Sequence, residues 1–114
     1  MKAASGGSEG QLHGEASRGD AQRQAILREA IREKRRLSFI YNTRRRIVEP
    51  QCLGLGAKGT GLLRAYQISG GSQLEPLFNV LKISHLVIMD ETFDRPWPHY
   101  KRGDSAMATI FCEL

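Results

Sequence analysis

The sequence predicts an α+β protein that is mostly β: a small antiparallel β-barrel with an N-terminal amphipathic helix and a short C-terminal helix or strand. Two observations predict this class. Apolar residues recur at helical spacing over residues 21–36, and beyond them short runs rich in Leu, Val, Ile and Phe alternate with turn residues at intervals of about ten positions. Short strands at such regular spacing are typical of a small barrel on which the helix packs.

The length of the chain fits one domain, since 114 residues with a hydrophobic content of 40% allow a single modest core. Residues 1–19 have almost nothing to bury, so we expect a disordered tail there and a single domain over residues 20–114. This start lacks the apolar run of a secretory signal, and no stretch approaches the roughly 20 apolar residues of a membrane span. We therefore expect a cytoplasmic protein without membrane contact.

The predicted helix begins at Ala21, where Asp20 can act as its N-cap. One apolar stripe at helical spacing then runs along it, formed by Ile26, Leu27, Ala30 and Ile31. The basic residues gather toward the C-terminal end, where the helix dipole favours them. This helix should bury the stripe on the sheet.

Five strand-like segments follow the helix, and turn residues at 42–45 separate the first two. They comprise residues 36–41, 46–55, 62–69, 77–83 and 85–93. Pro50 interrupts the second segment and suggests an edge position or a bulge. Residues 94–104 carry two prolines and predict an extended arm held by Trp97 and Tyr100, after which Asp104 can cap a final helix or precede a strand.

The glycines of the stretch GLGAKGTG, residues 54–61, have the G-x-G-x-x-G spacing of a dinucleotide-binding turn. That turn binds phosphate at the N-terminus of a following helix. Here the segment that follows, LLRAYQIS, has β character and no helical stripe. We therefore predict a hairpin connection in which glycines relax the backbone.

Neither a metal site nor an active site is indicated by the sequence. Cys52 and Cys112 lie far apart, and we expect both to be free and buried, with a disulfide as the alternative. The cysteines and histidines lack metal-ligand spacing, and no serine lies in a nucleophile elbow. We expect a binding protein with no cofactor and no metal, and not an enzyme.

Basic residues are concentrated in residues 23–46, which hold nine basic and two acidic side chains in a chain whose net charge is +5. A local charge of this kind attracts nucleic acid, nucleotides or acidic lipid. A solvated helix face followed by a charged turn would give the same pattern, so charge alone does not separate the two interpretations.

Three cations, Arg46, Arg64 and Lys82, fall on three different predicted strands. If those strands are neighbours, the cations can converge on one face with Tyr41 and Tyr66 nearby. Arginine beside an aromatic ring suits a phosphate and a stacked base. The alternative, that each cation is solvated or pairs with a carboxylate, stays open; the candidate carboxylates are Glu49, Asp90 and Glu91.

At these residues the chain resembles the WYL-domain family, from about Ile26 to Leu114. The stretches that carry the resemblance are AIREKRRLSFIYNTRRRIVEP, GLLRAYQIS, LFNVLKISHLVIMDETF and YKRGDSAMATIF. The resemblance implies an Sm-like antiparallel β-barrel. It also implies a sensing module of bacterial transcription regulation that binds nucleic acid or a nucleotide-like ligand through basic residues on the barrel.

The family's site, carried over residue by residue, falls on Arg46, which precedes the V-E-P signature, and then on Lys82 and Arg64. Lys82 stands where the family has a strand-end arginine. The W-Y-L tripeptide itself is replaced by residues 61–63, Gly-Leu-Leu. We expect no winged-helix DNA-binding domain ahead of the barrel, so the chain resembles the short, stand-alone form of the family.

Two functions follow as hypotheses. The first is a WYL-like regulatory domain that binds a negatively charged ligand, single-stranded nucleic acid or a nucleotide, through Arg46, Arg64 and Lys82 with Tyr41 or Tyr66 as a stacking surface. The second is a protein-interaction or homo-oligomerisation module without a small ligand, in which a barrel edge or the helix forms the interface.

Overall fold

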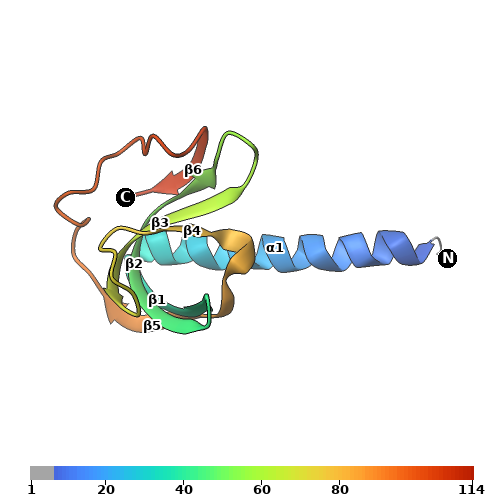
Figure 1. Cartoon of the computed structure of the whole chain (residues 1–114), viewed down its shortest axis with the longest axis horizontal. Coiled ribbons are helices and arrows are strands. Elements are labelled where there is room, and N and C mark those ends of the chain that lie inside the picture. The colour runs from blue at the N-terminus through green and yellow to red at the C-terminus, as the bar shows by residue number, and fades with distance from the viewer. Residues whose placement is uncertain (1–6) are drawn as a thin grey trace.

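Over residues 7–114 the fold consists of one α-helix, one short 3-10 helix and six strands (Figure 1). The computed structural model describes residues 7–114, with side chains from Gly19 onward. The elements, in chain order, are α1 (Gly7–Glu33), β1 (Arg35–Tyr41), β2 (Arg44–Leu55), β3 (Gly61–Ser69), β4 (Leu77–Asn79), the 3-10 helix η1 (Val80–Lys82), β5 (Ser84–Thr92) and β6 (Thr109–Glu113).

The strands form a single bent antiparallel sheet with the order β4-β3-β2-β1-β5. The long strand β2 pairs with β1 through its first half, at Val48 opposite Leu37 for example, and with β6 through its second half, at Leu53 opposite Cys112. β6 therefore takes the place beside β2 that β1 leaves. The predicted α+β, mostly-β class is confirmed. The predicted barrel is not, because the sheet is not closed.

The core lies between α1 and the bent sheet. Leu27, Ala30 and Ile31 of the predicted apolar stripe are at most 1% exposed, and they form one cluster with Phe39 and Phe78 from β1 and β4. The rings of Phe39 and Phe78 meet edge to face, with centroids 5.0 Å apart, an arrangement that aromatic pairs favour. The sheet-facing side of the helix is thus the one that the helical periodicity indicated.

The helix is longer than the sequence predicted. It begins at Gly7 and not at Ala21, and its N-terminal part extends away from the sheet (Figure 1). Asp20 is not an N-cap; it lies inside the helix, where its carboxylate pairs with Arg23 one turn later at 2.9 Å. Residues 7–19 of the predicted tail belong to α1, and residues 1–6 of that tail lie outside the described residues.

Three features of the strands refine the prediction. Pro50 lies in the central strand β2 and not at an edge, beside a register shift between Pro50 and Cys52, so the bulge is the correct alternative. The segment 77–83 is not one strand, because the Asn79 side chain accepts a hydrogen bond from the Leu81 amide and begins η1. The C-terminal segment forms a strand, β6, and not a helix.

The turn between β1 and β2 carries backbone strain. Asn42 and Thr43 have φ values of 51° and 65°, as in the type I′ turn of a two-residue hairpin. Asparagine tolerates this conformation, whereas the β-branched threonine does not.

We expect Thr43→Gly to stabilise the domain by about 1 kcal/mol, because glycine relieves this strain and completes the favoured Asn-Gly turn. Urea unfolding of the two proteins measures the change. A variant that is no more stable than the parent would show that Thr43 is not strained in solution.

Candidate anion-binding site

Strand alternation places two arginines of the charged hairpin on the core side of the sheet. Residues directly opposite each other in an antiparallel pair point to the same face. Arg46 is opposite Phe39, and Arg44 is opposite Tyr41. Because Phe39 belongs to the core, the side chains of Arg44 and Arg46 lie on the concave face, beside the turn of the hairpin.

Arg46 lies in a hollow of about 390 Å³ between this hairpin and the loop that joins β3 to β4. Its guanidinium carbon is 5.7 Å from the ring centroid of Tyr41 and 5.9 Å from that of Phe78, both cation–π distances. Tyr41 is itself fixed, since its hydroxyl accepts a hydrogen bond from the Asn79 amide at 3.0 Å. The rings of Tyr41 and Phe78, which pack in the core or against it, therefore fix the position of the Arg46 guanidinium.

The hydrogen bonds of Arg46 use three of the five N–H groups of its guanidinium, one on each nitrogen. Nε and Nη2 donate to the carbonyl oxygen of Tyr41 at 3.3 and 3.0 Å, and Nη1 donates to Oε1 of Gln67 at 3.1 Å. A guanidinium carries five N–H groups. Within the described part of the chain, one N–H on Nη1 and one on Nη2 remain unpaired. Two such groups can bind two oxygens of one phosphate or carboxylate.

Two consecutive glycines allow the β3–β4 loop to close over Arg46. A Cβ on Gly70 would clash with the carbonyl oxygen of Arg45, and the φ of Gly70 is +106°, which disfavours any other residue. A Cβ on Gly71 would lie 2.6 Å from Nη1 of Arg46 and 2.8 Å from Nε2 of Gln67. The loop thus approaches the guanidinium because both positions lack a side chain.

The hollow is positively charged. Arg44 and Arg46 line it together with Tyr41, Gln67 and Phe78, and no carboxylate side chain lines it among the described residues. Arg46 forms no ion pair in that part of the chain either, so no described carboxylate neutralises its charge. The site attracts anions for this reason.

Arg64 belongs to a different place. Leu63, Ala65 and Gln67 of β3 are buried, so the alternation turns Arg64 and Tyr66 to the opposite face. There Arg64 donates to both carboxylate oxygens of Asp104, at 2.7 and 3.3 Å, and to the carbonyl oxygen of Glu75 at 2.9 Å. The guanidinium lowers the pKa of Asp104 below its ordinary value of 3.8. Arg64 is therefore paired inside the protein, as the open alternative in the sequence allowed.

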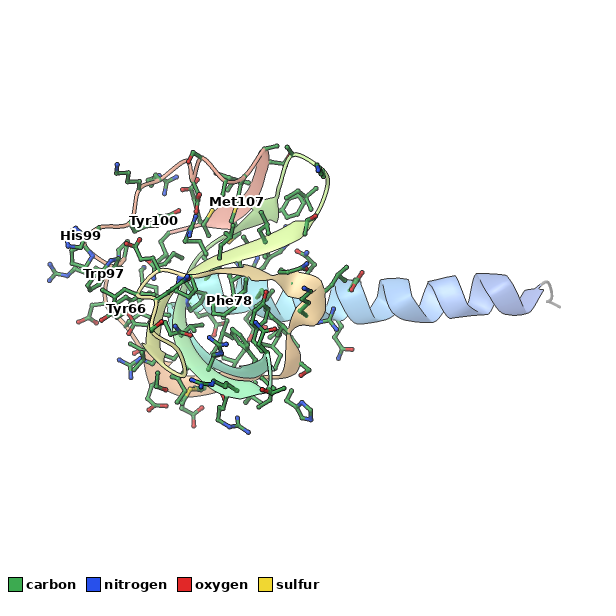
Figure 2. All side chains as sticks on the ribbon, in the orientation of Figure 1. Tyr66, Phe78, Trp97, His99, Tyr100 and Met107 are labelled. Carbon is green, nitrogen blue, oxygen red and sulfur yellow. The ribbon has the colours of Figure 1, made fainter. Side chains whose placement is uncertain are left out.

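Tyr66 does not offer a free stacking surface on that face. Its ring stacks on Trp97 from the arm, with centroids 4.1 Å apart and planes within 10° of parallel. Figure 2 shows Tyr66, Trp97 and His99 gathered at one side of the domain, whereas Phe78 lies within the curve of the sheet. Trp97 thus holds the arm to the sheet, as predicted, and occupies the ring that the ligand was expected to use.

Lys82 is also separate from the hollow. It ends η1, is exposed, and is not among the residues that line the hollow. Of the five predicted site residues, the structure brings together only Arg46 and Tyr41. The sequence reasoning missed Arg44, Gln67, Gly70 and Gly71. Counting the alternation through the two-residue turn would have identified Arg44, because it puts Arg44 and Arg46 on the face of Tyr41.

The two cysteines are free, as expected, and Cys52 is fully buried, but Cys112 is only partly buried. Burial raises the pKa of the Cys52 thiol to about 11, and its sulfur contacts that of Met107 at 3.5 Å. A thiol with so high a pKa is a poor nucleophile. Cys52 therefore acts as a small core residue.

Comparison of the chain with protein-family models, with curated proteins and with solved structures finds no match. Among the described residues, no helix combines the length and the apolar character that crossing a membrane requires. The same residues contain no cluster of three or more His, Cys, Asp or Glu side chains suited to a metal ion.

Proposed function

We propose that the chain is a WYL-like regulatory domain whose Arg46 hollow binds an anionic ligand, a nucleotide or a short single-stranded nucleic acid. The resemblance over residues 26–114 supports the family, and the order of a helix followed by a bent antiparallel sheet is compatible with an Sm-like architecture. Arg46 and Tyr41 are the residues of the predicted set that this function retains.

The observation that carries the proposal is the state of the Arg46 guanidinium. Two of its N–H groups have no partner among the described residues, while its remaining N–H groups are already bonded to Tyr41 and Gln67. Arg46 also lines a hollow to which no described carboxylate contributes. A phosphate bound there exchanges water for a charge-assisted, two-point contact without first having to order the side chain. Arg64 shows the contrast, since the carboxylate of Asp104 already neutralises its charge.

The dimensions and walls of the hollow favour part of a nucleotide. About 390 Å³ lies within the range of small-molecule sites, roughly 300–1,000 Å³. Exposed Arg44 provides a second cation beside the phosphate. The amide of Asn42 lies at the rim, where a base or sugar can accept or donate hydrogen bonds.

We expect Arg46→Ala to weaken the binding of a fluorescently labelled oligothymidylate about 30-fold, which corresponds to about 2 kcal/mol for a charged two-point hydrogen bond. Arg46→Lys should recover only part of the loss, because lysine keeps the charge but not the planar fork. Fluorescence anisotropy at low and moderate salt measures the affinities of both variants. Competition by an unlabelled nucleoside monophosphate then compares the affinity for a single nucleotide with that for the oligonucleotide.

Lys82→Ala is the matched control, since it removes one exposed charge away from the hollow. It should change affinity by less than about threefold, as expected for a screened surface charge. Equal losses in the Arg46 and Lys82 variants would show that binding depends on overall charge and not on this hollow. No binding by the parent protein at low salt would refute the proposal and favour the interaction module.

A further inference from the structure

A buried amide, Gln67, connects Arg46 to the loop between β3 and β4. Gln67 is 5% exposed and lies on the core face of β3, opposite Val48. Its Oε1 accepts a hydrogen bond from Nη1 of Arg46 at 3.1 Å, and its Nε2 donates to the carbonyl oxygen of Gln73 at 2.8 Å. Both polar ends of this buried side chain are thus satisfied, one by the cation and one by the loop.

The chemistry of these two contacts requires an amide at position 67. Arg46 presents only donors and the carbonyl of Gln73 only accepts, so the group between them must accept at one end and donate at the other. Glutamate would accept at both ends and neutralise Arg46 with a full negative charge. Leucine would have a similar size and satisfy neither partner, so Arg46 and the carbonyl of Gln73 would both lose a hydrogen bond.

The loop is also tied to the backbone of residue 67. The backbone N–H of Gln67 donates to the carbonyl oxygen of Leu74 at 2.8 Å, so residue 67 holds the loop through its main chain and its side chain. Gly71 lies against both Arg46 and Gln67, closely enough that a Cβ would displace one or both. The position of the loop and the direction of the guanidinium are therefore coupled.

We propose that Gln67 is a positioning residue, which holds the Arg46 guanidinium so that its two unpaired N–H groups face the hollow and which links that geometry to the β3–β4 loop. Its effect on ligand affinity rests on the function proposed above, whereas its effect on Arg46 does not. A ligand that binds Arg46 would accordingly also stabilise the loop, because the two share one hydrogen-bonded amide.

The first test needs no ligand. In the NMR spectrum of the full chain, the Nε–H signal of Arg46, identified by its absence in Arg46→Ala, reports whether the guanidinium is held. We expect Gln67→Leu and Gly71→Ala to raise the exchange rate of this Nε–H with water about tenfold, as expected when one hydrogen bond of a pair is lost. Ile68→Ala, which shortens an exposed neighbour of Gln67, should leave it unchanged.

The second test measures affinity for adenosine 5′-monophosphate by calorimetry, where both variants should bind about tenfold more weakly than the parent. Unchanged Nε–H exchange in both variants would overturn the positioning role. Faster exchange with unchanged affinity would overturn its importance for binding. If exchange is faster in the variants but the parent protein binds neither adenosine monophosphate nor oligothymidylate, the proposed function is refuted. The positioning of Arg46 by Gln67 would still stand. Gly71→Ala keeps the buried amide, so it separates positioning from a folding defect of Gln67→Leu.

Discussion

Gly54→Ala is expected to destabilise the domain by about 3 kcal/mol and to loosen β6 from β2. A Cβ at this position would clash with the carbonyl oxygen of Thr109 and lie 3.1 Å from the Cα of Ile110. Both are backbone atoms of β6, so no side-chain rotation relieves the contact and the strands have to separate. Urea unfolding gives the loss of stability, and amide hydrogen exchange over residues 109–113 shows where it occurs.

Gly59→Asn is the matched control from the same glycine-rich stretch. Gly59 has a φ of +83° but no atom within 4 Å of an added Cβ, and asparagine tolerates positive φ better than most residues. Its cost should stay below about 1 kcal/mol. Similar losses in the two variants, or unchanged exchange in β6 of Gly54→Ala, would contradict the close strand contact.

These glycines also show why their spacing alone could not predict the structure of this segment. Gly54, Gly56 and Gly59 match a dinucleotide turn in spacing, yet β3 follows them and not a helix, as the sequence predicted. The hairpin was predictable because the next segment has a β pattern. The reason for Gly54 was not, because it depends on β6, which lies more than fifty residues further along the chain.

The helix and most strands follow from local periodicity, since one buried face decides each of them. The stripe containing Leu27 and Ile31 and the alternation of Leu37 and Phe39 both identify core residues correctly. The end of β4 was missed because it depends on one side-chain cap, made by Asn79. A single polar contact of this kind has no periodic signal in the sequence.

The candidate site was harder to predict, because cations on different strands converge only if the alternation along each strand turns them to the same face of the sheet. Arg46 shares the face of Phe39, and Arg64 lies between the buried residues Leu63 and Ala65 on a different strand. A shift of one residue changes the face. Counting from the buried positions would have separated Arg46 from Arg64, whereas the partner of Arg64, Asp104, lies forty residues away in the irregular arm.

Arg64→Ala is expected to destabilise the domain by about 3 kcal/mol while leaving the affinity of the folded protein for oligothymidylate unchanged. Arg64 is the partner of Asp104, whose side chain is only 8% exposed, so the substitution leaves a nearly buried carboxylate without its cation. Removing one member of such a pair costs more than removing both. The double variant Arg64→Ala, Asp104→Ala should therefore be more stable than Arg64→Ala alone.

The pH dependence of stability distinguishes this pair from a general effect of truncating Arg64. Arg64 lowers the folded-state pKa of Asp104 below 3.8, so the folded protein binds this proton less readily than the unfolded chain does. The resulting stability is fully present above the unfolded-state pKa and is lost as the pH falls through the folded-state value. The free energies of unfolding of the parent and of Arg64→Ala, measured by urea at several pH values, should differ most near neutral pH. The difference should disappear only as the pH falls through the folded-state pKa of Asp104, which lies below 3.8. A difference that does not change with pH would mean that Arg64 stabilises the domain by packing and by its bond to the Glu75 carbonyl. A loss of oligothymidylate affinity in the folded Arg64→Ala variant would instead show that Arg64 belongs to the binding site. A side chain that is paired on the outer face should not contact a ligand in the Arg46 hollow.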